Sequence, residues 1–132
     1  MPASIQTFEM ITFSEVEEAV EDVFGKGSVG LDKRGASNAN EIARATFVRA
    51  SALLVVKQRC EAIGLNRSDG AQKYFEINRK VRQECSAFLG IEENEAFRLH
   101  HRAAGLRAKD PKYRDVAQRI ERDVAKRYGM VV

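Results

Sequence analysis

One run of the sequence restricts the fold more than any other. Residues 41–63, EIARATFVRASALLVVKQRCEAI, contain neither glycine nor proline. The middle of the run, residues 50–56, would place apolar side chains on nearly every side of an α-helix, and a helix that is apolar all round is normally buried. We therefore expect this run to be the central helix of the protein, capped by Asn38 or Asn40 and ending at Gly64.

Four more helices are expected on either side of the central one, because apolar residues recur there at spacings of three and four. Residues that cap or stop helices mark their ends. We predict these helices from Ser14 to Gly25, from Ser68 or Asp69 to Gly90, from about Glu92, and from Asp110 and Pro111 to Gly129. The predicted fold class is therefore all-α: a compact bundle of about five helices with a short N-terminal arm.

The 132 residues are expected to form a single helical domain. Within it, residues 1–13 are the N-terminal arm and residues 25–37 are a glycine-rich basic connector. In the first helix, Ser14 and Glu17 have the spacing of a capping box. The centres of the most apolar helical stripes predict buried positions at Leu53, Val56, Ile77, Val81 and Phe88.

Charge and cysteine content narrow the class of protein. The formal net charge of +3 is mildly basic and falls short of a dedicated polycation. Cys60 and Cys85 fit apolar stripes and form no CxxC pair, so we expect free thiols and a cytoplasmic location. No stretch approaches the roughly 18 apolar residues of a membrane span, and we expect no membrane partner.

Residues 25–30, GKGSVG, match the G-x-G-x-x-G pattern of dinucleotide-binding loops. Such a loop needs a strand before it and a helix that begins at its last glycine. Here a predicted helix precedes the glycines, and the GK[ST] ending of a P-loop is missing. We interpret the glycines as a helix end followed by a mobile connector, and we predict no nucleotide cofactor.

The sequence contains no recognisable pattern of a metal or catalytic site. His100 and His101 are adjacent, so on one helix they point about 100° apart and cannot share a metal ion. The chain has neither a G-x-S-x-G nucleophile elbow nor a cysteine beside a recognisable base. We predict no catalytic residue, no metal site and no cofactor, and therefore a protein that is not an enzyme.

An uneven distribution of charge favours binding to another protein molecule. Residues 9–22 contain six acidic residues and no lysine or arginine, whereas residues 67–132 contain fifteen basic and ten acidic residues. We therefore expect a small binding or regulatory protein that acts through protein–protein interaction and self-associates. Arginine and aromatic residues are enriched at interfaces, and the interface candidates are Ile5, Phe8, Ile11, Phe13, Arg119 and Arg122. For the apolar arm, the alternative is that it only covers the end of the bundle.

DNA or RNA binding is the alternative function, because two junctions between helices resemble a helix-turn-helix. After the first junction, around Gly64, the chain offers side chains suited to bases and phosphates. At the second, around Gly90, the apolar pattern fits better, but the next helix begins with acidic residues that would repel phosphates. The nucleic-acid candidates all lie at the first junction: Asn66, Arg67, Gln72, Lys73 and Arg79.

Overall fold

The structure, a computed structural model, describes residues 9–30, 39–65 and 70–131. Within these ranges it contains five helices and no strand. The helices are α1 (Phe13–Phe24), α3 (Glu41–Ala62), α4 (Ala71–Leu89), α5 (Glu93–Lys109) and α6 (Pro111–Lys126). The predicted all-α bundle of about five helices is confirmed.

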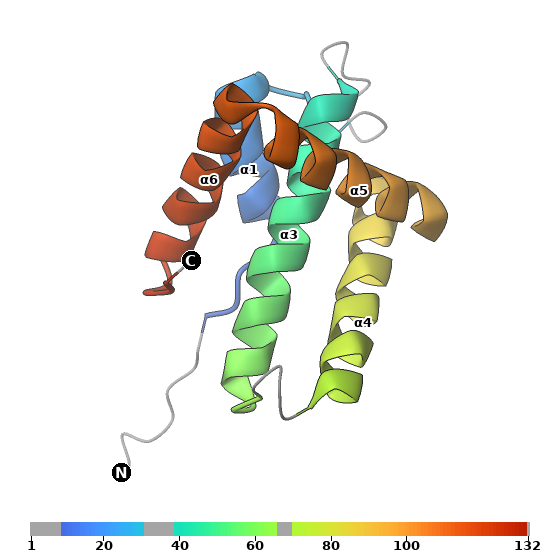
Figure 1. Cartoon of the computed structure of the whole chain (residues 1–132), viewed down its shortest axis with the longest axis vertical. Helices are drawn as coiled ribbons and strands as arrows, with labels where there is room; N and C mark the ends of the chain where they lie inside the picture. Colours follow the sequence, from blue (N-terminus) through green and yellow to red (C-terminus); the bar gives the residue numbers. More distant parts are fainter. Residues whose placement is uncertain (1–8, 31–38, 66–69, 132) are drawn as a thin grey trace.

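As expected, α3 is the central helix, and it contacts each of the other four. Figure 1 shows α3 and α4 side by side and antiparallel, with α5 crossing them near one end. α1 and α6 pack against α3 and against each other. At the end opposite α5, α3 and α4 extend beyond the other helices (Figure 1). We refer to this part, residues 57–65 and 70–80, as the hairpin end.

Polar side chains fix the starts of α3 and α6 as the sequence predicts. The Asn40 side chain accepts a hydrogen bond from the backbone N–H of Ala43 at 2.7 Å. Asp110 accepts hydrogen bonds from the first turn of α6, where Pro111 is the first helical residue. These bonds satisfy backbone N–H groups that have no partner within the helix.

The predicted capping box of α1 is wrong by two residues. Thr12 and Glu15 form it, in place of Ser14 and Glu17. Starting the helix at Phe13 places that ring 6.5 Å from the ring of Phe47 in α3, between ring centroids. Glu17, the acidic residue of the predicted box, is only 4% exposed and caps nothing at the start of the helix. Packing of the helix against α3 therefore decides between two starts that satisfy the same capping pattern.

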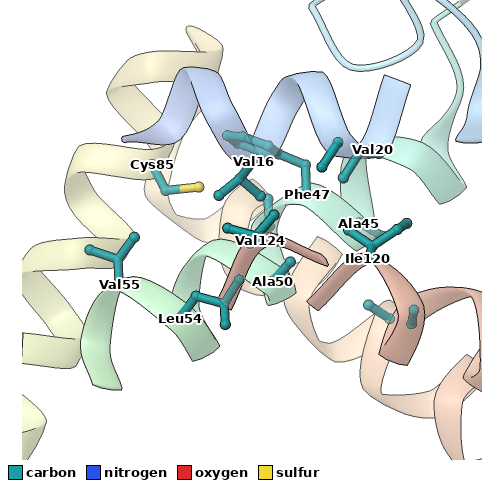
Figure 2. Close-up of a cluster of buried hydrophobic side chains, with 14 of the residues drawn as sticks. Val16, Val20, Ala45, Phe47, Ala50, Leu54, Val55, Cys85, Ile120 and Val124 are labelled. Atoms are coloured by element: carbon teal, nitrogen blue, oxygen red, sulfur yellow. The ribbon is translucent and has the colours of Figure 1, made fainter. Parts of the chain in front are cut away.

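The core lies where the outer helices face α3. Figure 2 shows Val16 and Val20 of α1 beside Phe47, whose side chain is fully buried. Phe88 of α4 stacks on Phe47 with ring centroids 5.6 Å apart. Aromatic contacts of this kind add to the apolar area that three helices remove from water.

Of the five positions predicted to be buried, two are buried, two are only partly buried, and the prediction for Leu53 is wrong. Val56 and Val81 are buried, and Ile77 and Phe88 are partly buried and pack against the core. Leu53 is only half-buried, while its neighbour Leu54 is 0% exposed. Consecutive residues on a helix point about 100° apart. Where several in a row are apolar, the sequence alone does not show which of them faces the core.

The GKGSVG segment ends α1 and then turns into the core. α1 stops at Phe24, as predicted, and Gly25 has a φ of 110°, which glycine adopts without steric strain. Val29 is 0% exposed, and its backbone N–H donates to a carboxylate oxygen of Glu21 at 3.3 Å. A backbone donor that a phosphate could use is thus occupied by a carboxylate of the same chain. Residues 31–37 of the expected connector lie outside the described residues.

Candidate functional site

Apolar side chains are exposed at the hairpin end. Ile63, just after α3, is 58% exposed, and Phe75, near the start of α4, is 62% exposed. Met10, in the segment before α1, is 38% exposed and reaches the same end of the molecule. Met10 and Ile63 line one groove, whereas Phe75 lies on another side of α4. Exposed apolar side chains of this size are typical of interaction surfaces.

An open groove of about 620 Å³ lies between α3 and α4 at this end. Its apolar lining comes from Met10, Ala62, Ile63 and Ile77. Its charged lining carries both signs and comes from Arg59, Lys73, Lys80, Glu76 and Glu84. The groove therefore combines an apolar floor with a rim that can attract either sign of charge.

Ion pairs within the chain order part of this rim. The guanidinium of Arg59 donates two hydrogen bonds to the carboxylate of Glu84, at 2.7 and 2.9 Å. These bonds hold the pKa of Glu84 below its ordinary value. The ammonium of Lys73 lies 3.6 Å from a carboxylate oxygen of Glu76, and both side chains are 59% exposed. This second pair is weak in water, so a binding partner can replace it at little cost.

The described arm residues belong to the bundle itself. Ile11 is 5% exposed, and its backbone N–H donates to the side-chain oxygen of Gln58 in α3 at 2.6 Å. Phe13 packs against two aromatic rings of the core. This placement agrees with the alternative in which the arm covers the bundle. Ile5 and Phe8 lie outside the described residues.

Arg119 and Arg122, the interface candidates of the last helix, are both exposed on α6. α6 lies on the far side of α3 from α4, away from the hairpin end (Figure 1). The two arginines and the apolar groove therefore form separate candidate surfaces.

The structure separates the candidates for nucleic-acid binding. Gln72 and Arg79 are exposed on one face of α4, since seven residues make nearly two full turns. Lys73 points about 100° away from Gln72 and pairs with a glutamate. Asn66 and Arg67 lie outside the described residues. Moreover, α3 and α4 are antiparallel (Figure 1), whereas helices of a helix-turn-helix cross at about 90–120°.

A buried polar cluster that the sequence did not predict joins α3, α5 and α6. Nη1 of Arg107 lies 2.6 Å from Oε2 of Glu121, a residue that is 2% exposed. The hydroxyls of Thr46 and Tyr113 are 2.7 Å apart. Glu121 follows the buried Ile120 within the apolar stripe of α6. A carboxylate in an apolar stripe is the signal that could have revealed the cluster, because a buried charge needs a partner.

A more enclosed pocket of about 260 Å³ lies between α3, α4 and α5, and Cys85 and His100 both line it. Burial raises the pKa of Cys85 to about 12, although the neighbouring Ser51 hydroxyl acts in the opposite direction. Its thiol is therefore not a nucleophile near neutral pH. Burial lowers the pKa of His100 to about 4, helped by the nearby charges of Arg49, His101 and Arg82. The His100 ring is thus neutral under physiological conditions.

The described part of the chain holds no group of three or more His, Cys, Asp or Glu side chains that could bind a metal ion. None of the described helices is both long and apolar enough to cross a membrane. Comparison with known protein families, with characterised proteins and with solved structures finds no match to this chain.

Proposed function

We propose that this chain is a small, non-enzymatic binding protein that self-associates through the hairpin end. The exposure of Ile63 and Phe75, at 58% and 62%, is the observation that carries the proposal. Water contact with large apolar side chains is unfavourable, and removing them from water drives most protein association. Both belong to the hairpin end, which extends beyond the other helices (Figure 1) and is accessible to a second molecule.

The proposed partner is a second copy of the chain, packed through the same hairpin end about a two-fold axis. In such an interface each copy presents the same surface, so that surface must be complementary to itself. The groove meets this requirement, because Lys73 and Lys80 lie on the same rim as Glu76. A lysine of one copy can therefore face a glutamate of the other while the apolar residues meet at the centre.

A stable dimer also sets the area that the interface must bury. A standard interface takes about a tenth of a small protein's surface from each partner. The surface of this chain is 8031 Å², so a tenth is roughly 800 Å² per copy. Most of that area would have to come from the hairpin end and the adjoining Met10.

Size-exclusion chromatography with light scattering, over about 1–200 μM protein, tests the proposal. We expect the mass to rise towards twice that of one chain as the concentration increases. The double variant Ile63→Ser, Phe75→Ser should remain monomeric, because the two most exposed apolar side chains of the hairpin end are gone. A Val23→Ser variant is the matched control, since Val23 is 42% exposed on α1, and it should associate like the wild type.

The same experiment separates the competing surfaces. Association that survives Ile63→Ser, Phe75→Ser but is lost in Arg119→Glu, Arg122→Glu would move the interface to α6. A wild-type chain that stays monomeric at the highest concentration refutes self-association.

Adding a mixed-sequence DNA duplex tests the alternative function, in which Gln72 and Arg79 would contact nucleic acid through the exposed face of α4. Salt-sensitive binding that Arg79→Ala weakens would favour that alternative.

We further propose that the protein acts in a reducing compartment such as the cytoplasm. Cys60 and Cys85 are free thiols and both are buried. Such thiols support a location in which disulfides do not persist.

A further inference from the structure

The pocket between α3, α4 and α5 has the composition of a small-molecule site. Its walls are mostly apolar and include Val48, Ala52, Val81 and Phe97. Ligand sites typically combine such walls with a few polar groups that fix the orientation of the ligand. Its volume of about 260 Å³ exceeds the roughly 150 Å³ of an apolar cavity that is able to hold benzene. A compact body of one ring therefore fits.

The polar groups of this pocket are cationic or neutral, and none is a carboxylate. Arg82 and His101 line it together with Asn78 and the neutral His100. Arg49 adds a further positive charge behind the pocket, where its Nη1 lies 3.4 Å from Nε2 of His100. An anionic group is the ligand chemistry that this charge distribution favours.

Arg82 is positioned to hold the anion. Its guanidinium carbon lies 5.1 Å from the centre of the Phe97 ring, which orients the group across the pocket. Its Nε is buried and has no hydrogen-bond partner in the described part of the chain. Its Nη2 forms an ion pair with Glu93, 3.4 Å from Oε1, at the long end of hydrogen-bond distances, so a bound carboxylate would compete with Glu93 for this nitrogen. Arg82 thus retains donors for a carboxylate, which guanidinium groups bind in a bidentate manner.

We propose that this pocket binds a small organic monocarboxylate, with its apolar body against Val81 and Phe97 and its carboxylate on Arg82. This inference goes beyond the proposed self-association and does not depend on it. The pocket is lined by residues of α3, α4 and α5, and it shares no lining residue with the association groove.

Nuclear magnetic resonance of the two histidine rings tests the proposal with benzoate as the probe and benzamide as its neutral analogue. The chain has only two histidines, and both line the pocket. We expect saturable shifts of both rings with a dissociation constant for benzoate below about 1 mM. Benzamide should bind about ten-fold more weakly, because it cannot form a charge-assisted pair with Arg82.

A second readout is the titration of His100. Burial is the largest cause of its pKa of about 4, and the charges of Arg49, His101 and Arg82 contribute. A bound anion offsets those charges, so benzoate should raise the pKa of His100 while benzamide leaves it nearly unchanged.

Three variants complete the experiment. Arg82→Gln should weaken benzoate binding about ten-fold and bring it to the level of benzamide. Arg79→Gln is the matched control, because Arg79 is an exposed residue of the same helix that does not line the pocket, and it should leave the affinity unchanged. Ala52→Leu should block both probes by filling the cavity. Equal binding of benzoate and benzamide, equal effects of Arg82→Gln and Arg79→Gln, or no shift up to about 10 mM benzoate would overturn the proposal.

Discussion

Replacing Arg107 by leucine should be among the most destabilising changes in the bundle. Its guanidinium lies 2.6 Å from the carboxylate of Glu121, which is 2% exposed. Without Arg107, that carboxylate remains in the core without its ion-pair partner, and breaking a buried pair costs about 3–5 kcal/mol. We expect about 3 kcal/mol, because the Arg107 side chain is still 20% exposed and the charge of Arg49 also interacts with Glu121.

Urea denaturation followed by circular dichroism measures this loss. Thermal unfolding gives the same loss as a change in Tm. For 132 residues the entropy of unfolding is about 0.28 kcal/mol/K, so a loss of 3 kcal/mol corresponds to a fall in Tm of about 11 °C. The exposed Arg98→Leu is the control: its ion pairs with Glu41 and Glu95 lie in solvent, and the urea midpoint should barely change.

The double variant Arg107→Leu, Glu121→Leu isolates the cause of the loss. It should recover at least about 1 kcal/mol relative to Arg107→Leu, because the buried carboxylate is removed together with its partner. A loss below about 1 kcal/mol in Arg107→Leu, or a double variant less stable than the single one, would refute the reasoning.

Three further predictions use stability and reactivity as readouts. Leu54→Ala should cost about 2–5 kcal/mol and Leu53→Ala about 1 kcal/mol in urea unfolding, because only Leu54 is fully buried. The pKa of His100 is about 4 in the folded chain and about 6.5 when unfolded. Between pH 4 and 6.5 the unfolded state therefore binds more protons than the folded state, so the free energy of unfolding should fall as the pH drops from about 6.5 to 4. In a plot of the urea midpoint against pH, His100→Gln should flatten this part of the curve. Cys60 and Cys85 are buried and the pKa of each is raised by burial, so a thiol reagent at neutral pH should label them only after urea unfolds the chain.

The helices could be predicted from the sequence because their ends depend on local chemistry. Asn40, Pro111 and Gly90 act through the backbone of their own helix, and each is found at a predicted helix end, Asn40 being one of the two caps offered for α3. Where two local patterns compete, tertiary packing decides. The capping box formed by Thr12 is chosen over the one at Ser14 because it brings Phe13 onto the core.

The inward face of a helix was harder to predict where apolar residues are consecutive. Within residues 50–56, Leu53 and Leu54 are equally apolar, and only the direction from which the neighbouring helices approach distinguishes them. In amphipathic α6, by contrast, Val124 and Ile120 are four residues apart and both are buried, as their spacing indicates.

The pocket illustrates why a site in a helical bundle leaves little trace in the sequence. Cys85 lies in α4 and His100 in α5, and the crossing of the two helices brings both to one cavity. Each residue alone fits an ordinary helical position, since cysteine resembles a small apolar residue and histidine is common at helix surfaces. Two further residues make the cavity a candidate site. Ala52 on α3 is small and leaves space opposite Cys85 and His100, and Arg82 places a positive charge at the edge of the cavity. Both conditions depend on three helices at once, so no spacing along one helix could reveal them.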